Sequence, residues 1–214
     1  PYLPADRQDE ALFRFYLGVY DLFNWFKETY PDVMIENCSG GGGRYDLGMM
    51  KYSNLIWTSD NTEAKYRVHI QHGSSYGYPM STMSCHVSNR HGQCEDERML
   101  DYSFRVAING PLGYEFNILK ADEKTKDIIR RQIEEYRAYE NLILNGDFYR
   151  LKNPENEDCY AYYIINAERS EIMVSYLQNN CIEKQKSIYK NTVKCDIFLS
   201  ILLQRRLKYS IIIY

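Results

Sequence analysis

An acidic residue at the end of a short apolar run is the strongest chemical signal in the sequence. The run 55–58 leads into Ser59 and Asp60, and Asn61 and Thr62 follow at once. Parallel α/β enzymes carry catalytic groups at the carboxyl ends of their strands, so this carboxylate could donate and accept a proton there. An aspartate before polar residues could equally cap the N-terminus of the next helix. The residues alone leave the two interpretations level.

A second strand end lies upstream and opens into a glycine-rich loop. Glu36 and Asn37 end an apolar segment, and Cys38, Ser39 and Gly40–Gly43 follow. Glycines lack a side chain, so the backbone N–H groups of such a loop can approach the hydroxyl groups of a ligand. A phosphate loop is not indicated, because no Gly-Lys-Ser/Thr sequence follows; a plain flexible loop is the other interpretation. Two neighbouring strand ends, one acidic and one glycine-rich, predict a shared pocket.

Two further sets of polar residues have simpler interpretations. Arg44 could orient a carboxylate, but a structural pair with Asp46 is the better interpretation. Several histidines and cysteines raise the question of a zinc site: His69, His72, Cys85, His86, His91 and Cys94. Their spacings follow no common zinc-ligand pattern, so we expect neither a metal nor any other cofactor.

The hydrophobic pattern predicts the elements that would hold these side chains. Apolar residues at spacings of three and four predict a helix over residues 8–30, which Pro31 ends. Strands are predicted over 33–36, 55–58, 81–87 and 104–108, and further helices over 62–70 and 122–144. Alternation of strands and helices implies a parallel α/β sheet or barrel.

The pattern changes after Gly146. Residues 148–151, 161–167 and 172–178 read as strands joined by polar turns, which predicts an antiparallel β module. We therefore expect one domain over 1–145 and a second over 146–214, with an atypical tail from about residue 179. Four parallel strands are half of an eight-stranded barrel, and a whole barrel typically takes about 250 residues. The sequence thus predicts a fragment.

Composition excludes several classes of partner. The formal charge of −3 and the pI near 5.9 argue against a nucleic-acid-binding face. No run approaches the roughly 20 apolar residues of a membrane-spanning helix, so we expect no membrane association. The six cysteines contain no CxxC pair, which favours reduced thiols and a cytoplasmic location.

Four ordered motifs resemble the α-galactosidases of glycoside hydrolase family 36, over about residues 8–178. The motifs are ENCSGGGGRYD at 36–46, WTSDNT at 57–62, GPLGYE at 110–115 and GDFYRL at 146–151. The resemblance implies the C-terminal half of a (β/α)8 TIM barrel followed by a truncated antiparallel β-sandwich domain. From about residue 179 to the end the sequence departs from the family.

The resemblance also implies a function. It implies retaining hydrolysis of terminal α-linked galactose in sugars of the raffinose and melibiose type, by an enzyme that is a homo-oligomer. It gives Asp60 the general acid/base role and places Cys38, Ser39, Gly40, Gly41 and Asp60 around the substrate. The family nucleophile lies on a Lys-Trp-Asp motif that this sequence lacks, so we expect the chain alone to be inactive. A non-catalytic carbohydrate-binding or interaction module is the alternative.

Overall fold

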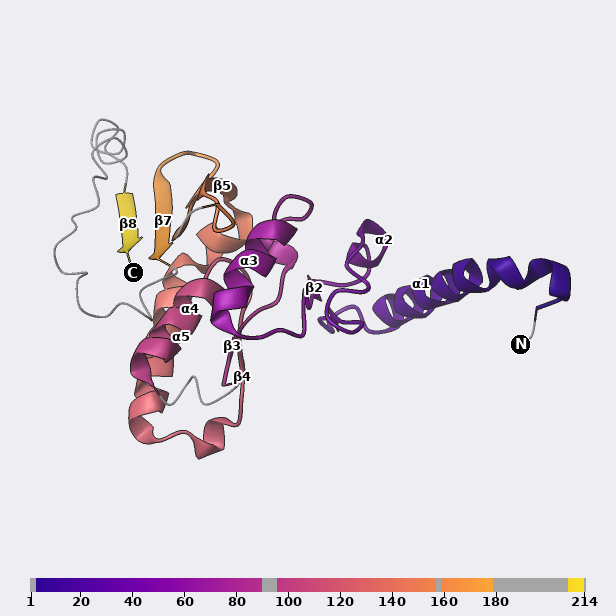
Figure 1. Ribbon diagram of the computed structural model, residues 1–214, viewed down its shortest axis with the longest axis horizontal. Helices are drawn as coiled ribbons and strands as arrows, with labels where there is room; N and C mark the ends of the chain where they lie inside the picture. Colours follow the sequence, from indigo (N-terminus) through magenta and orange to yellow (C-terminus); the bar gives the residue numbers. More distant parts are fainter. Residues whose placement is uncertain (1–2, 90–95, 157–158, 179–207, 214) are drawn as a thin grey trace. The chain divides into compact units, whose positions relative to one another are not determined.

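The computed structural model describes residues 3–89, 96–156, 159–178 and 208–213 (Figure 1). The chain divides into two compact units, Pro1–Asp60 and Asn61–Tyr214.

The first unit combines a long helix with one short parallel strand pair. The 3-10 turn η1 (Ala5–Glu10) leads into helix α1 (Ala11–Thr29), which ends where the Tyr30 N–H still donates to the Phe26 carbonyl. Strand β1 (Glu36–Asn37), helix α2 (Leu47–Met50) and strand β2 (Leu55–Ile56) follow. The predicted helix over 8–30 is confirmed in its main part, whereas the strand expected over 33–36 is displaced to Glu36–Asn37.

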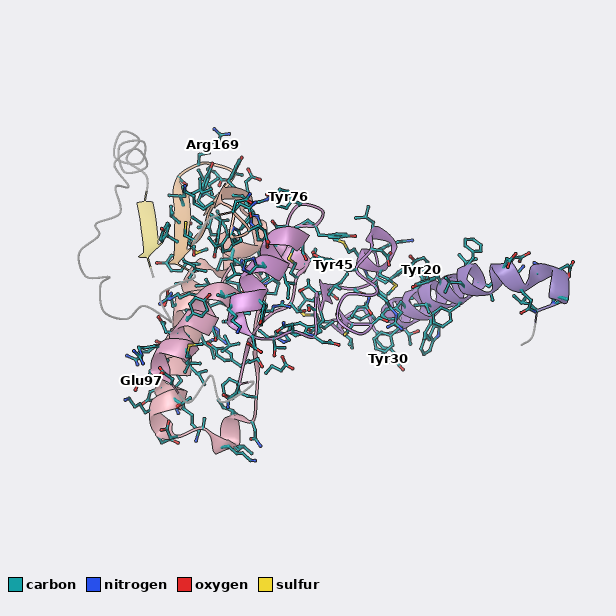
Figure 2. The ribbon with its side chains drawn as sticks, in the orientation of Figure 1. Tyr20, Tyr30, Tyr45, Tyr76, Glu97 and Arg169 are labelled. Atoms are coloured by element: carbon teal, nitrogen blue, oxygen red, sulfur yellow. The ribbon has the colours of Figure 1, made fainter. Side chains whose placement is uncertain are left out.

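The second unit begins with alternating helices and strands. Helix α3 (Ala64–Ser74), the 3-10 turn η2 (Met80–Thr82) and strand β3 (Cys85–Ser88) come first. Helix α4 (Glu97–Ala107), strand β4 (Leu112–Glu115), the 3-10 turn η4 (Ile118–Lys120) and helix α5 (Glu123–Asn145) follow. Strands β3 and β4 pair in parallel, and α4 packs on β3 and contacts α3 and α5. Glu97, in the first turn of α4, is labelled in Figure 2.

The strand predicted over 104–108 is wrong, because most of this segment belongs to α4. The Asp96 carboxylate accepts from the Arg98 N–H and caps the helix. Leu100, Phe104 and Ala107 are buried and lie three and four residues apart, which is the repeat of a helix face. The aromatic and β-branched residues of Phe104–Ile108 imitate a buried strand in sequence, and the actual fourth strand is β4.

The second unit ends in a four-stranded sheet in the order β5-β6-β7-β8. Strands β5 (Asp147–Lys152), β6 (Cys159–Ile165) and β7 (Glu171–Gln178) pair antiparallel, as expected. In the β6–β7 turn Arg169 adopts φ 53° (Figure 2). Strand β8 (Lys208–Ile213) pairs parallel to β7, so the prediction of a wholly antiparallel module is wrong at this edge.

The described residues contain two separate parallel pairs and do not close a barrel. They likewise form one sheet after residue 146 and no second sheet that would complete a sandwich. Strands β1 and β2 have two residues each, and the four parallel strands β1–β4 are half the number of an eight-stranded barrel. In the part of the chain that the structure describes, no helix is long and apolar enough to cross a bilayer.

Candidate active site

The candidate site is built at the carboxyl ends of β1 and β2, within the first unit. The strands are parallel, with Glu36 opposite Leu55 and Asn37 opposite Ile56. The Trp57 N–H extends this pairing by donating to the Asn37 carbonyl at 2.8 Å. Both strands therefore release their chains at the same edge. The two strand ends are therefore neighbours, and the shared pocket stays a prediction.

The glycine loop lies directly against the segment that ends in Asp60. Gly40, Gly41 and Gly42 have φ values of 55°, 67° and 98°, a region that favours glycine. A Cβ on Gly41 would lie 2.3 Å from the Asp60 backbone nitrogen, and one on Gly42 would lie 2.6 Å from the Thr58 carbonyl oxygen. The absence of side chains thus lets two backbone segments touch, and this contact fixes where the Asp60 backbone stands.

The side chains of Arg44, Asp46 and Tyr20 form hydrogen bonds at the other end of the loop. The Arg44 guanidinium donates to the Cys38 carbonyl at 2.9 Å, which closes the loop across six residues. Asp46 accepts from the Met49 N–H and caps α2, and it also accepts from the Tyr20 hydroxyl of α1 at 3.0 Å. This bond to Asp46 raises the pKa of the Tyr20 hydroxyl.

The structural role expected for Arg44 is confirmed, although its partner is a carbonyl rather than Asp46. The sequence offered no signal for the link from Tyr20 to Asp46, since the two residues lie 26 positions apart. Tyr45, between Arg44 and Asp46, is labelled with Tyr20 and Tyr30 in Figure 2.

Asp60 itself is exposed, as is Cys38, whereas Ser39 is half-buried. The alternative in which Asp60 caps the next helix is wrong. Helix α3 begins at Ala64 with Glu63 in the N-cap position, and no side chain bonds that cap. Asp60 therefore lies outside the N-cap of α3, four residues before its first residue. Its position beside Gly41 and its exposure suit a group that must reach a ligand.

The histidines and cysteines do not assemble a metal centre within the described residues. His69 pairs with Glu155 through its Nδ1 at 2.6 Å, and His72 is buried. Burial raises the pKa of the Cys85 thiol to about 12, so this group stays protonated and is a poor zinc ligand. His91 and Cys94 lie outside the described residues.

Comparison with known proteins identifies the family of this chain. Residues 1–146 match the Melibiase family. The α-galactosidase Mel36A of Lactobacillus acidophilus is 40% identical over 175 residues, which are 81% of this chain and 24% of that protein. The chain therefore spans about a quarter of the length of this relative.

Solved structures give the same result. A crystal structure of a variant of the GH36 α-galactosidase AgaA from Geobacillus stearothermophilus, in complex with raffinose, matches with a TM-score of 0.76 at 39% identity. The α-galactosidase of Lactobacillus brevis matches with a TM-score of 0.76 at 37% identity. Each match covers 82% of this chain and 24% of the other. By sequence and by fold, this chain belongs to the Melibiase family and is similar to its glycoside hydrolase family 36 α-galactosidases.

Proposed function

We propose that this chain supplies the general acid/base of a retaining α-galactosidase, and that Asp60 is that group. The observation that carries the proposal is the contact of the Gly41–Gly42 backbone with the Thr58–Asp60 segment at two paired strand ends. It fixes the backbone of the exposed Asp60 against the loop that also contains Cys38 and Ser39, the residues that the family resemblance assigns to galactose. We propose that Gly40 and Gly41 line the same sugar site.

The chemistry follows from the two-carboxylate mechanism. One carboxylate attacks the anomeric carbon while the acid, Asp60, protonates the departing glycosidic oxygen; Asp60 then takes a proton from the water that releases the sugar. The two carboxyl groups must stand about 5 to 5.5 Å apart. The sequence contains no Lys-Trp-Asp motif, so we propose that the nucleophile comes from a segment outside this chain.

The substrate and setting are proposals as well. The AgaA structures hold raffinose and stachyose, and we propose that this chain acts on the same class of terminal α-galactosides. We propose a cytoplasmic location, since Cys38, Cys85 and Cys159 are free thiols, and a homo-oligomer from the family resemblance alone. We also propose that β1–β4 belong to the second half of a (β/α)8 barrel, and that a β domain begins at residue 146, after α5.

The test uses a restored enzyme, in which this chain is joined to the upstream part of Mel36A that carries the nucleophile. Asp60→Asn should lower kcat for raffinose hydrolysis by about 10²- to 10⁴-fold, the usual contribution of a general acid/base. The loss should be smaller for the first step on a nitrophenyl α-galactoside, because that leaving group needs little protonation. Azide should restore turnover, since it attacks the intermediate without a general base.

The matched control is Asp32→Asn, which removes an exposed carboxylate in the turn before β1. It should leave both rates unchanged. Equal losses on the two substrates without azide rescue would assign Asp60 a structural role. Galactose binding by a restored enzyme that never turns over would instead support a non-catalytic carbohydrate-binding module.

A further inference from the structure

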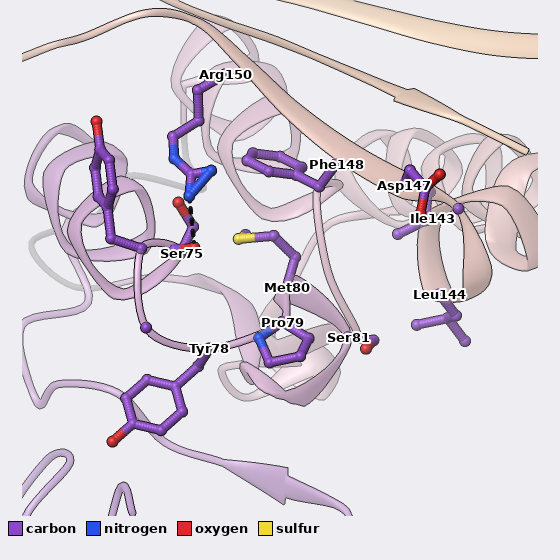
Figure 3. Close-up of a pocket in the computed structure, with 13 residues that line it drawn as sticks. Ser75, Tyr78, Pro79, Met80, Ser81, Ile143, Leu144, Asp147, Phe148 and Arg150 are labelled. Atoms are coloured by element: carbon purple, nitrogen blue, oxygen red, sulfur yellow. Dashed lines mark hydrogen bonds between the residues drawn. The ribbon is translucent and has the colours of Figure 1, made fainter.

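A cavity of about 390 Å³ lies wholly within the second unit (Figure 3). Its walls are the loop 75–81 that follows α3, the last turn of α5, and the start of β5. Cavities of a few hundred Å³ are of the size that small ligands occupy. None of these residues belongs to the unit that contains Asp60, so the cavity is a separate feature.

The acceptor groups of the cavity come from the end of α5 and one carboxylate. Helix α5 ends at Asn145, at the border of the cavity, and the carboxyl end of a helix carries partial negative charge. The last carbonyls of α3 already accept from the N–H groups of residues 75–78. Asp147 lines the cavity and its side chain is exposed. The charge of Asp147 and the end of α5 disfavour an anionic ligand.

The Arg150 guanidinium brings positive charge and hydrogen-bond donors to the same lining. Arg150 donates to the Ser75 carbonyl at 2.9 Å, and its Cζ lies 4.2 Å from the centre of the Tyr76 ring. Figure 3 shows this guanidinium above Ser75, with the Phe148 ring to its right. Arg150 carries five N–H donors in total. Its positive charge disfavours a cationic ligand.

Apolar surface completes the lining. Phe148, Pro79 and Met80 form one wall, and the Tyr76 ring, 67% exposed, stands beside the guanidinium. The Ser81 hydroxyl, which can both donate and accept, also lines the cavity. The cavity thus offers hydrogen-bond acceptors, hydrogen-bond donors and an apolar wall, with lining charges of opposite sign.

We propose that this cavity binds a neutral saccharide. A sugar carries hydroxyl groups that can donate to an acceptor such as Asp147 and accept from a donor such as Arg150. Its apolar C–H face can lie on the aromatic wall. This site is additional to the catalytic site, and the proposal holds whether or not Asp60 is a catalytic residue. An open, polar cavity of this kind should bind with a dissociation constant in the millimolar range.

The experiment follows the ε-methyl group of Met80 in the full 214-residue chain, labelled with ¹³C at its methionine methyl groups. Met80 lines the cavity, and Met80→Leu identifies its signal. Galactose and raffinose should each shift this signal in a saturable manner. Inorganic phosphate and tetramethylammonium, at equal concentration, should not. A shift with phosphate or with the cation but not with sugar would overturn the proposal, as would a Met80 signal that no probe moves.

Three variants locate the binding. Asp147→Ala removes an exposed carboxylate and should weaken the Met80 titration at least tenfold, while the matched control Glu168→Ala, in the exposed β6–β7 turn, should leave it unchanged. Asp60→Asn should also leave it unchanged, which separates this site from the proposed catalytic one. An unaltered titration in Asp147→Ala and also in Ser81→Ala would show that the sugar binds elsewhere.

Discussion

Gly41 combines two requirements that no other residue meets at its position. Its φ of 67° is strained for a residue with a side chain, and its Cα lies so close to Asp60 that a Cβ would stand 2.3 Å from the backbone nitrogen. Backbone atoms cannot rotate away as the end of a long side chain can. A substitution here must therefore move either the glycine loop or the proposed acid.

We expect Gly41→Ala to lower the rate of the restored enzyme on raffinose on the order of 100-fold, because a displacement of about 1 Å is enough for such a loss. Gly40→Ala is the matched control, measured at saturating raffinose because Gly40 is itself proposed to line the sugar site. Its φ of 55° brings the same type of backbone strain, but no atom lies within 4 Å of its added Cβ. The two variants should differ in steady-state rate far more than in thermal stability. Equal rates would show that the loop does not position Asp60.

His72 makes the stability of the second unit depend on pH. The imidazole is buried beside the rings of Tyr76 and Tyr160, and burial, followed by the charge of Arg150, lowers its pKa. In the unfolded chain its pKa is about 6.5, so below that pH the unfolded state takes up a proton that the folded state refuses. Stability is therefore fully present above that pH and falls as the pH drops toward the folded pKa.

The measurement is the denaturant midpoint at pH 7 and at pH 5, followed by circular dichroism. The native chain should lose stability on acidification, and His72→Gln should lose less, even if its midpoint at pH 7 is already lower. His69→Gln serves as the control. His69 lies in α3, one turn before His72, but it is half-exposed and pairs with Glu155. A pH slope that His69→Gln removes and His72→Gln retains would reassign the effect.

At the scale of elements, helix α4 depends on one buried ring. Phe104 is fully buried between α4 and the β3 side of the unit. Phe104→Ala should lower the free energy of unfolding by about 3–5 kcal/mol, from lost burial and the cavity left behind. Arg98→Ala, on the exposed face of the same helix, should change it by no more than about 0.5 kcal/mol. Urea denaturation of the two variants measures the difference, and similar midpoints would contradict the assigned helix face.

The same helix shows where prediction from sequence stops. Residues with strong local signals gave correct elements: α1 has apolar residues at helical spacing, and α5 has Asp122 at its N-cap and Gly146 beyond its end. Phe104–Ile108 misled because a short aromatic and β-branched run suits a buried strand and a buried helix equally. The parallel pairing of β8 with β7 was beyond prediction, since no local pattern encodes a partner so distant in sequence.

The candidate site divides in the same way. The strand ends at Asn37 and Ile56 were predicted to within two residues, because the apolar runs 33–36 and 55–58 are followed by polar residues. The physical reason for the glycines was not: Gly41 and Gly42 accommodate the chain itself, and the sequence suggested only an approach to a ligand. The bond from Arg44 to the Cys38 carbonyl also escaped prediction, since a backbone acceptor leaves no trace in the sequence.

At the scale of the whole molecule, the first unit leaves a large amount of apolar surface uncovered. No residue of α1 is buried, and Leu12, Phe13 and Leu22 are 67%, 66% and 60% exposed. Contiguous apolar surface of this kind is covered by partners or drives association. In the described part of the chain, nothing buries this helix.

We therefore expect the isolated 214-residue chain to associate with itself, with a mass by light scattering that exceeds 25.4 kDa and rises with concentration. The double variant Leu12→Lys with Phe13→Lys should lower that mass, because two charges would have to be desolvated in any contact that buries α1.

Leu119→Lys is the control, since Leu119 is 87% exposed but lies in η4 of the second unit, away from any apolar stretch of helix. A monodisperse 25.4 kDa species with a sharp thermal transition would show that α1 tolerates water without a partner. A fall in mass with Leu119→Lys alone would place the contact in the second unit instead.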